Sequence, residues 1–403
     1  MVASSALSEN PRVGASSGRP SNFFPLVNSL AASSPHPPVR ILVICLRRIG
    51  DVLLATPLIR SLKQAWPEAQ IDALVFASTA AVLAGNPDLH GVIAWQPKAG
   101  NGEKWQRIVK LWRRYDLAVS ATNSDRAHYA AWIAGRHRVV VGPPGDRWKA
   151  LLLQERIAHD PGRLHAVTQS LLLVDRLGIP RVPSLVPPRP ADESALDALL
   201  GAGWRSRRYA VVHPQAMFRY KSWTEAGWQT LIRWLSAQGL RVLVSSGPDA
   251  AERAAVRALI AGLALPDDAL FDLGGRLPFA ALTPLIEHAA LYVGPDTSVT
   301  HLAAATGAPT LALFGPSSPV TWGPWPQDWD GSADSPWRMA APLQRIGNVA
   351  LLQGDLGRRI GCIPCLQEGC ERHTGSRSDC LDRMSAARVI AAAAQLLGIR
   401  APA

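Results

Sequence analysis

The chain has 403 residues, of which 48% are hydrophobic and 18% charged, values that exclude a wholly disordered protein and suit two domains of ordinary size. Its 42 Lys and Arg residues outnumber 31 Asp and Glu residues, and the net charge of +11 favours anionic partners, although the arginine excess also fits the codon bias of a GC-rich genome. No apolar run reaches the length of about 18 residues that a spanning helix needs, and the five cysteines do not form the pattern of a disulfide-rich secreted protein, so we expect a cytoplasmic protein.

The first half of the chain alternates strands and helices. Residues 1–38 are rich in Ser, Pro, Ala and Asn, which predicts a disordered leader rather than a signal peptide. The apolar run at 39–46 predicts a buried strand, and 52–66 predicts a helix with Pro57 in its first turns. The elements expected next are strands at 71–76, 117–120 and 138–142 and a helix at 159–178. This order indicates a parallel α/β domain over 39–180.

The alternation begins again after a proline-rich stretch. Five prolines within 179–190 mark a linker, which we extend to 181–208. The elements expected after it are strands at 209–213, 241–246, 290–294 and 309–315 and a helix at 223–238 capped by Thr224 or Ser222. The Trp-, Pro- and Gly-rich residues 322–360 predict loops, and 385–397 predicts an amphipathic helix that packs back on the first domain. We therefore predict two facing Rossmann-like domains with a cleft between them, the second spanning 209–384, and a C-terminal helix within 385–403.

Two turns from a strand into a helix carry polar residues. In the first, Gly50 and Asp51 follow the strand at 39–46, and the absence of further spaced glycines disfavours a dinucleotide-binding fingerprint. In the second, Gly294-Pro295-Asp296-Thr297-Ser298 leads into an apolar helix. A helix N-terminus is a seat for phosphate, and the hydroxyls of Thr297 and Ser298 either cap the helix or bind a ligand.

Three segments together carry a family resemblance. Arg47-Arg48-Ile49-Gly50-Asp51 with the following Val52–Pro57, the stretch Gly294–Ala304 and the run Leu313-Phe314-Gly315-Pro316-Ser317-Ser318-Pro319 resemble the signatures of glycosyltransferase family 9, the ADP-heptose:lipopolysaccharide heptosyltransferases. The resemblance covers residues 39 to 397. It implies the GT-B fold and transfer of heptose from ADP-heptose to a hydroxyl of the lipopolysaccharide inner core, with inversion at the anomeric carbon and no cofactor required for catalysis.

The resemblance also assigns roles to single residues. It implies Asp51 as the catalytic base, Arg47, Arg48 and Gly50 on the acceptor side of the cleft, and Lys221, Glu252, Asp296, Thr297, Ser298 and His301 on the donor side. Lys221 is expected at the diphosphate, Glu252 at the ribose, and Asp296 at sugar hydroxyls or in the turn. Two readings stay open, because Glu252 also fits a solvated helix face and His301 also fits a packed core. The loop Gln215–Phe218 departs from the family pattern, which leaves open which backbone groups touch phosphate.

Four cysteines crowd together near the end of the chain. Cys362, Cys365, Cys370 and Cys380 have the spacing of metal ligands, with His373 as a substitute for one of them. We expect a structural zinc or iron here, and relatives that modify proteins bind iron through such cysteines. Reduced thiols without metal are the alternative.

The expected partners follow from the same resemblance. They are ADP-heptose, a lipopolysaccharide inner-core acceptor whose Kdo carboxylates and lipid A phosphates suit the basic chain, and the inner membrane as a peripheral contact. Two alternatives remain, namely a protein O-heptosyltransferase of the same fold and a nucleotide-sugar epimerase that releases the sugar without an acceptor. Binding of nucleic acid is disfavoured because no basic stripe is interleaved with aromatic residues.

Overall fold

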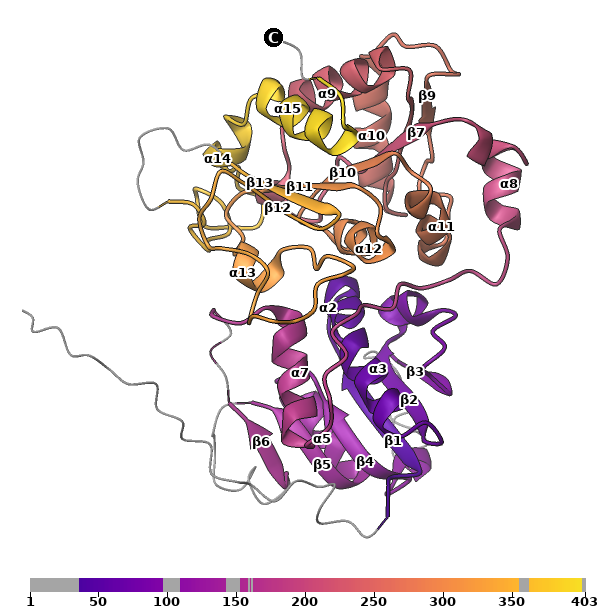
Figure 1. The fold of residues 1–403 in the computed structure, drawn as a ribbon, viewed down its shortest axis with the longest axis vertical. Helices are drawn as coiled ribbons and strands as arrows, with labels where there is room; N and C mark the ends of the chain where they lie inside the picture. Colours follow the sequence, from indigo (N-terminus) through magenta and orange to yellow (C-terminus); the bar gives the residue numbers. More distant parts are fainter. Residues whose placement is uncertain are drawn as a thin grey trace, which may run out of the picture.

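The computed structural model describes residues 36–96, 109–142, 153–158, 160, 162–354 and 362–400. They form two lobes, each built on one sheet with helices on both faces, and Figure 1 shows the lower, N-terminal lobe facing the upper, C-terminal one. The leader expected at 1–38 lies almost entirely outside the described residues. Within these residues, no helix combines the length and the apolar character needed to cross a membrane.

The sheet of the N-terminal lobe has six strands in the order β3-β2-β1-β4-β5-β6, all parallel. The strands are β1 (Arg40–Cys45), β2 (Gln70–Phe76), β3 (Gly91–Trp95), β4 (Tyr115–Ser120), β5 (Gly135–Val141) and β6 (Glu155–Ile157). β1 is buried on both faces, as its continuous apolar run predicts: Ile41 and Val43 belong to one core cluster, Leu42 and Ile44 to another. The helices are α2 (Ile49–Leu54), α3 (Thr56–Ala65), α5 (Asp125–Ala134) and α7 (Ala166–Arg176).

The single helix expected at 52–66 is in fact the two helices α2 and α3. The chain breaks at Ala55, because Pro57 in the first turn of α3 has no N–H to continue the ladder of α2. The hydroxyl of Thr56 instead donates to the carbonyl of Leu53 at 2.7 Å. α2 therefore begins earlier than predicted, at Ile49, and its first turn points toward the upper lobe (Figure 1).

The sheet of the C-terminal lobe has seven strands in the order β12-β13-β11-β10-β7-β8-β9, and only β12 is antiparallel. The strands are β7 (Tyr209–Val212), β8 (Arg241–Val244), β9 (Leu270–Asp272), β10 (Leu291–Pro295), β11 (Thr310–Phe314), β12 (Leu343–Ile346) and β13 (Val349–Gln353). β12 and β13 correct the prediction of loops throughout 322–360. They form a hairpin whose turn contains Gly347 at φ +54°, a conformation that suits glycine.

The helices of the C-terminal lobe cover both faces of this sheet. They are α8 (Ser194–Leu200), α9 (Glu225–Ala237), α10 (Ala250–Ala261), α11 (Leu282–Glu287), α12 (Ser298–Thr306), α13 (Pro319–Trp322), α14 (Asp379–Asp382) and α15 (Ala386–Leu397). Of the two caps proposed for α9, Thr224 is the one used, since its side chain accepts from the N–H of Gly227. The linker is irregular up to residue 193 and then contains α8.

The last helix does not return to the first domain as we predicted. α15 packs on α9 and on β10, β11 and β13 of its own lobe, at the side away from the N-terminal lobe (Figure 1). Its apolar face, with Val389, Ile390 and Ala393, completes the core of that lobe beside Leu381 and Met384. An amphipathic pattern specifies a buried face but not which apolar surface covers it.

The two lobes meet through a shared apolar seam. α2 packs against α12, and one core cluster joins Val52 and Leu53 of the lower lobe to Val299 and Leu302 of the upper lobe. Beside it, the buried His165 at the start of α7 donates from Nε2 to the carbonyl of Gly323 at 2.7 Å, while its Nδ1 accepts from Val167. The seam brings the first turns of α2 and α12 together.

Candidate active site

The candidate residues follow the carboxyl ends of parallel strands in both lobes. Asp51 lies after β1, Lys221 after β7, Asp296 after β10 and Ser317 after β11. β7 pairs with β8 on one side and β10 on the other, so the strand order reverses there. In open α/β sheets such a reversal is where ligands bind.

Asp51 stands in the first turn of α2, at the seam with the upper lobe. Its carboxylate accepts from Nε of Arg47 at 3.0 Å, and its side chain is 18% exposed. The neighbouring Gly50 contacts α12: a Cβ built on it would lie 3.4 Å from Cδ2 of His301 and 3.9 Å from Cα of Ser298. The first turn of α2 therefore packs against the start of α12, and the charge of Asp51 acts on His301 there.

Lys221 and Asp296 form a close ion pair in the upper lobe. Nζ of Lys221 lies 2.5 Å from Oδ2 of Asp296. Burial works to lower the pKa of Lys221, but the charge and the hydrogen bond of Asp296 outweigh it and raise this pKa. Burial conversely works to raise the pKa of Asp296, and Lys221, His301 and a hydrogen bond from Ser317 together lower it. Both groups are thus charged at neutral pH.

His301 lies one turn into α12 and is buried. Burial lowers its pKa, with Asp296 and Asp51 working in the opposite direction and Lys221 adding to the lowering, so its imidazole is neutral at pH 7. Its Nδ1 has no hydrogen-bond partner among the described residues. His301 combines both readings left open by the sequence, because it is packed in the seam and also lies near carboxylates of both lobes.

The hydroxyl of Thr297 serves as the N-cap of α12. Thr297 is the N-cap residue, and its hydroxyl accepts from the N–H of Thr300 at 3.4 Å. The same hydroxyl lies 3.3 Å from that of Thr300, which in turn donates to the carbonyl of Pro295. Thr297 therefore caps the helix, and the first-turn N–H groups around Ser298 are the ones such a terminus leaves for an anion.

Glu252 is placed on α10, beside the loop that follows β8. Its Oε1 accepts from the N–H of Gly247 at 2.6 Å, and Asp249 caps the helix. The carboxylate is thus held against this loop and is not a freely solvated group on the helix face.

Two further residues at the site were not singled out by the sequence. Ser317 donates to Asp296, as noted above, and Phe218 stacks on Tyr220 with ring centroids 5.5 Å apart and an interplanar angle of 6°. The guanidinium of Arg48 lies 5.1 Å from the ring centroid of Phe218, which joins the two lobes. The departure of Gln215–Phe218 from the family pattern was the available signal for Phe218, and the quoted motif around Pro316 was the signal for Ser317.

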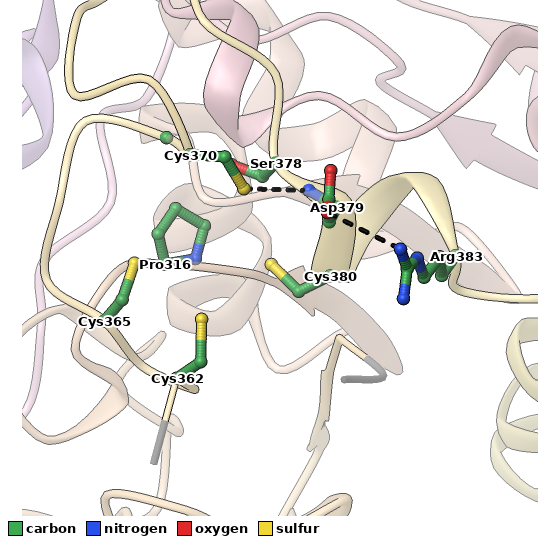
Figure 2. A pocket seen from close by; sticks show the side chains of 9 residues that line it. Pro316, Cys362, Cys365, Cys370, Ser378, Asp379, Cys380 and Arg383 are labelled. Atoms are coloured by element: carbon green, nitrogen blue, oxygen red, sulfur yellow. Dashed lines mark hydrogen bonds and ion pairs between the residues drawn. The ribbon is translucent and has the colours of Figure 1, made fainter. Parts of the chain in front are cut away.

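The four cysteines of the C-terminal lobe border one small pocket. Figure 2 shows Cys362, Cys365, Cys370 and Cys380 around Pro316, and none of them forms a disulfide. Burial, with the neighbouring cysteines, raises the pKa of Cys380 to about 12. His373 is exposed, pairs with Glu371 at 2.9 Å and is not among the lining residues. Over the described ranges, no three His, Cys, Asp or Glu side chains are arranged to hold a metal ion, so the zinc or iron stays a prediction.

Solved structures with the same architecture define the class of the fold. The structure of Escherichia coli ADP-heptose LPS heptosyltransferase II is similar with a TM-score of 0.67 and 22% identity, over 89% of this chain and 98% of that one. A glycosyltransferase family 9 structure from Veillonella parvula gives a TM-score of 0.69 at 18% identity, over 89% and 97%. The two lobes have the GT-B fold, as predicted.

Sequence comparisons then give the family. The model for glycosyltransferase family 9 (heptosyltransferase) matches residues 106–334. Lipopolysaccharide heptosyltransferase 3 of Escherichia coli is 30% identical over 291 residues, 68% of this chain and 83% of that protein. Lipopolysaccharide heptosyltransferase 1 of Pseudomonas aeruginosa is 27% identical over 82% of this chain and 87% of that protein. The chain belongs to glycosyltransferase family 9 and is an enzyme, which confirms the resemblance.

Proposed function

We propose that this enzyme transfers heptose from ADP-heptose to a hydroxyl of the lipopolysaccharide inner core, with inversion at the anomeric carbon. The observation that carries the proposal is the meeting of charged groups from both lobes at His301: Asp51 of one lobe and the Lys221–Asp296 pair of the other all act on its pKa. A family 9 relative from Escherichia coli is an LPS heptosyltransferase, and so is one from Pseudomonas aeruginosa.

Each lobe then has a distinct part in the reaction. Asp51 takes the proton of the acceptor hydroxyl as its oxygen bonds to the anomeric carbon, and the bond from that carbon to ADP breaks on the opposite face. The departing diphosphate gains negative charge, which the Lys221 ammonium and the N–H groups at Ser298 stabilise. Asp296 holds Lys221 in place and accepts from sugar hydroxyls.

The remaining residues divide between donor and acceptor. We place the donor on residues 209–384, with Glu252 at the ribose and His301 against the sugar, and the acceptor on residues 39–180. Arg47 and Arg48 suit the carboxylates and phosphates of the inner core, because guanidinium groups bind such anions in pairs of hydrogen bonds. The proposed place of action is the cytoplasmic face of the inner membrane, where such an acceptor is anchored.

A structural metal at the four cysteines is a separate proposal. It is supported by the donor set, four thiols around one pocket, which suits zinc or iron. Ligation requires the sulfur atoms to draw in to about 2.3 Å from a common centre. Metal analysis of the purified protein and of Cys365→Ser tests it: stoichiometric zinc or iron in the first and its loss in the second are expected, whereas metal-free wild-type protein contradicts the proposal.

The decisive experiment measures transfer from ADP-heptose to a panel of truncated core acceptors, using wild-type protein and Asp51→Asn. We expect one acceptor to be used, with kcat about 10²- to 10⁴-fold lower in the variant and ADP affinity unchanged, because a general base contributes roughly that factor. Asp175→Asn is the matched control, since this aspartate also pairs with an arginine, Arg181, but at the surface. Turnover without any acceptor indicates an epimerase-like release, and a normal kcat in Asp51→Asn removes Asp51 as the base.

A further inference from the structure

The cysteine-rich segment, residues 362–382, contacts both loops that hold Asp296. Its Ser378 hydroxyl, buried, donates to the carbonyl of Tyr220 at 2.7 Å. Its Leu366 N–H donates to the carbonyl of Pro316 at 2.9 Å. Tyr220 immediately precedes Lys221 and Pro316 immediately precedes Ser317. Both hydrogen-bonding partners of Asp296 are therefore one residue away from a contact with this segment.

The segment is itself tightly closed. Gly369 has φ +82°, and a Cβ there would lie 1.9 Å from Oγ of Ser376 and 2.9 Å from Cβ of Tyr220. The backbone at Gly369 therefore runs directly against the loop that contains Tyr220 and Lys221, called the Lys221 loop below. The N–H of Cys370 donates to the carbonyl of Arg377 at 2.9 Å. The Cys370 sulfur in turn accepts from the N–H of Asp379 at 3.4 Å, next to Ser378 (Figure 2).

The Lys221 loop has little regular structure of its own. It consists of a 3₁₀ turn, Arg219–Lys221, between irregular segments. Such a short turn is not stable alone, and the rotamer entropy of a free lysine opposes a fixed position for Nζ. Its tertiary contacts must therefore fix the loop, and the buried Ser378–Tyr220 bond is the one that reaches its backbone directly before Lys221.

We infer that the cysteine-rich segment braces the donor site and that Ser378 is a positioning residue, which acts on the donor diphosphate only through Tyr220 and Lys221. One part of this inference, that the segment affects the affinity for ADP, rests on the proposed function. Its structural part, the order of the Lys221 loop, does not depend on that function.

The test compares Ser378→Ala with Ser170→Ala. Ser170 is a matched control because it is also buried and its hydroxyl donates to a carbonyl, that of Val167, at 2.7 Å, but in the N-terminal lobe. Ser378→Ala leaves the buried carbonyl of Tyr220 without this donor, so we expect the variant to weaken ADP binding about tenfold and to speed amide exchange at 219–223 by a similar factor. The KM for donor should rise, with the KM for acceptor unchanged, and Ser170→Ala should change none of these.

Three outcomes separate the brace from the proposed function. Unchanged ADP affinity and unchanged exchange at 219–223 in a folded Ser378→Ala variant overturn the brace. If the wild-type protein binds no ADP and Ser378→Ala nevertheless speeds exchange at 219–223, the brace is supported and the proposed donor is contradicted. If Ser378→Ala does not purify as a folded protein, Ser376→Ala carries the same expectation and the same refutation, because it removes the bond of the buried Ser376 hydroxyl to the carbonyl of Glu368, 2.6 Å away, within the segment.

Discussion

At the scale of single residues, the Lys221–Asp296 pair shows how two buried charges are accommodated at the proposed donor site. A buried ammonium or carboxylate is tolerated only with a partner, and each of these groups is the other's. In the proposed reaction the donor diphosphate gives Lys221 a second anion, while Asp296 keeps the hydrogen bond from Ser317 and the nearby His301. The ion pair thus holds both side chains in fixed positions.

This arrangement predicts two separable effects of removing Lys221. Lys221→Gln leaves Asp296 buried without its main partner, so we expect the free energy of unfolding to fall by about 3 kcal/mol and ADP binding to weaken at least tenfold. The double variant Lys221→Gln, Asp296→Asn removes both charges and should recover most of the stability but none of the ADP affinity. Urea unfolding and calorimetric titration with ADP measure the two quantities. Recovery of ADP binding in the double variant would refute a phosphate role for Lys221.

The sequence indicates the candidate site residues better than it indicates the side chains that contact them. Asp51, Lys221 and Asp296 stand at fixed places in recognisable motifs, and in the structure each lies in or at the end of a strand or in the segment that follows one. The bond from Ser317 to Asp296 and the stacking of Arg48 on Phe218 join loops that are distant in the sequence. Such contacts depend on how side chains approach in three dimensions, which periodicity and spacing do not encode.

At the scale of elements, strands with continuous apolar runs were predicted well and the two misread segments had local signals. The sequence predicts one helix at 52–66 with Pro57 in its first turns. Because Pro57 has no N–H, the segment instead forms two helices. The hairpin of β12 and β13 has Gly347 and Asn348 between two short strands, a turn signal that the tryptophans and prolines of 322–360 obscured. Composition is a poor guide where short elements sit between long loops.

The helix α12 allows the capping and binding roles of a hydroxyl to be separated. Because the hydroxyl of Thr297 accepts from Thr300, we expect Thr297→Ala to lower the free energy of unfolding by about 1 kcal/mol and Thr297→Ser to preserve it. ADP affinity should change less than about threefold in either, since backbone N–H groups face the anion. Denaturation and ADP titration of both variants are the measurements. A large loss of affinity in Thr297→Ala at unchanged stability would instead place the hydroxyl on the ligand.

At the scale of the whole molecule, one apolar cluster continues from the first lobe into the second. It includes Leu58 and Leu171 below the seam and Leu302 and Trp325 above it. His165 belongs to this seam, with its ring 4.7 Å from that of Trp325 between centroids. We therefore expect the two lobes to unfold together, although each has its own sheet, because exposing the seam uncovers apolar surface of both.

Three buried histidines make this joint stability depend on pH. Burial lowers the pKa of His165 to about 3 and that of His213 to about 4, from an ordinary value of 6.5, and it also lowers the pKa of His301. Below pH 6.5 the unfolded chain therefore binds protons that the folded chain does not, so stability is complete above that pH and falls as the pH drops toward 4. At pH 5 each of His165 and His213 accounts for roughly 2 kcal/mol of this loss.

Urea unfolding of wild-type protein and His165→Gln at pH 7 and pH 5 tests the assignment. The substitution removes one titrating group, so the loss of unfolding free energy between the two pH values should be smaller in the variant by roughly 2 kcal/mol, whatever its stability at pH 7. Comparing differences between pH values, rather than absolute stabilities, separates titration from the loss of packing on Trp325 and of the bond to Gly323. Equal losses in both proteins would mean that His165 keeps an ordinary pKa in the folded chain, and hence that the seam between the lobes is open to water there.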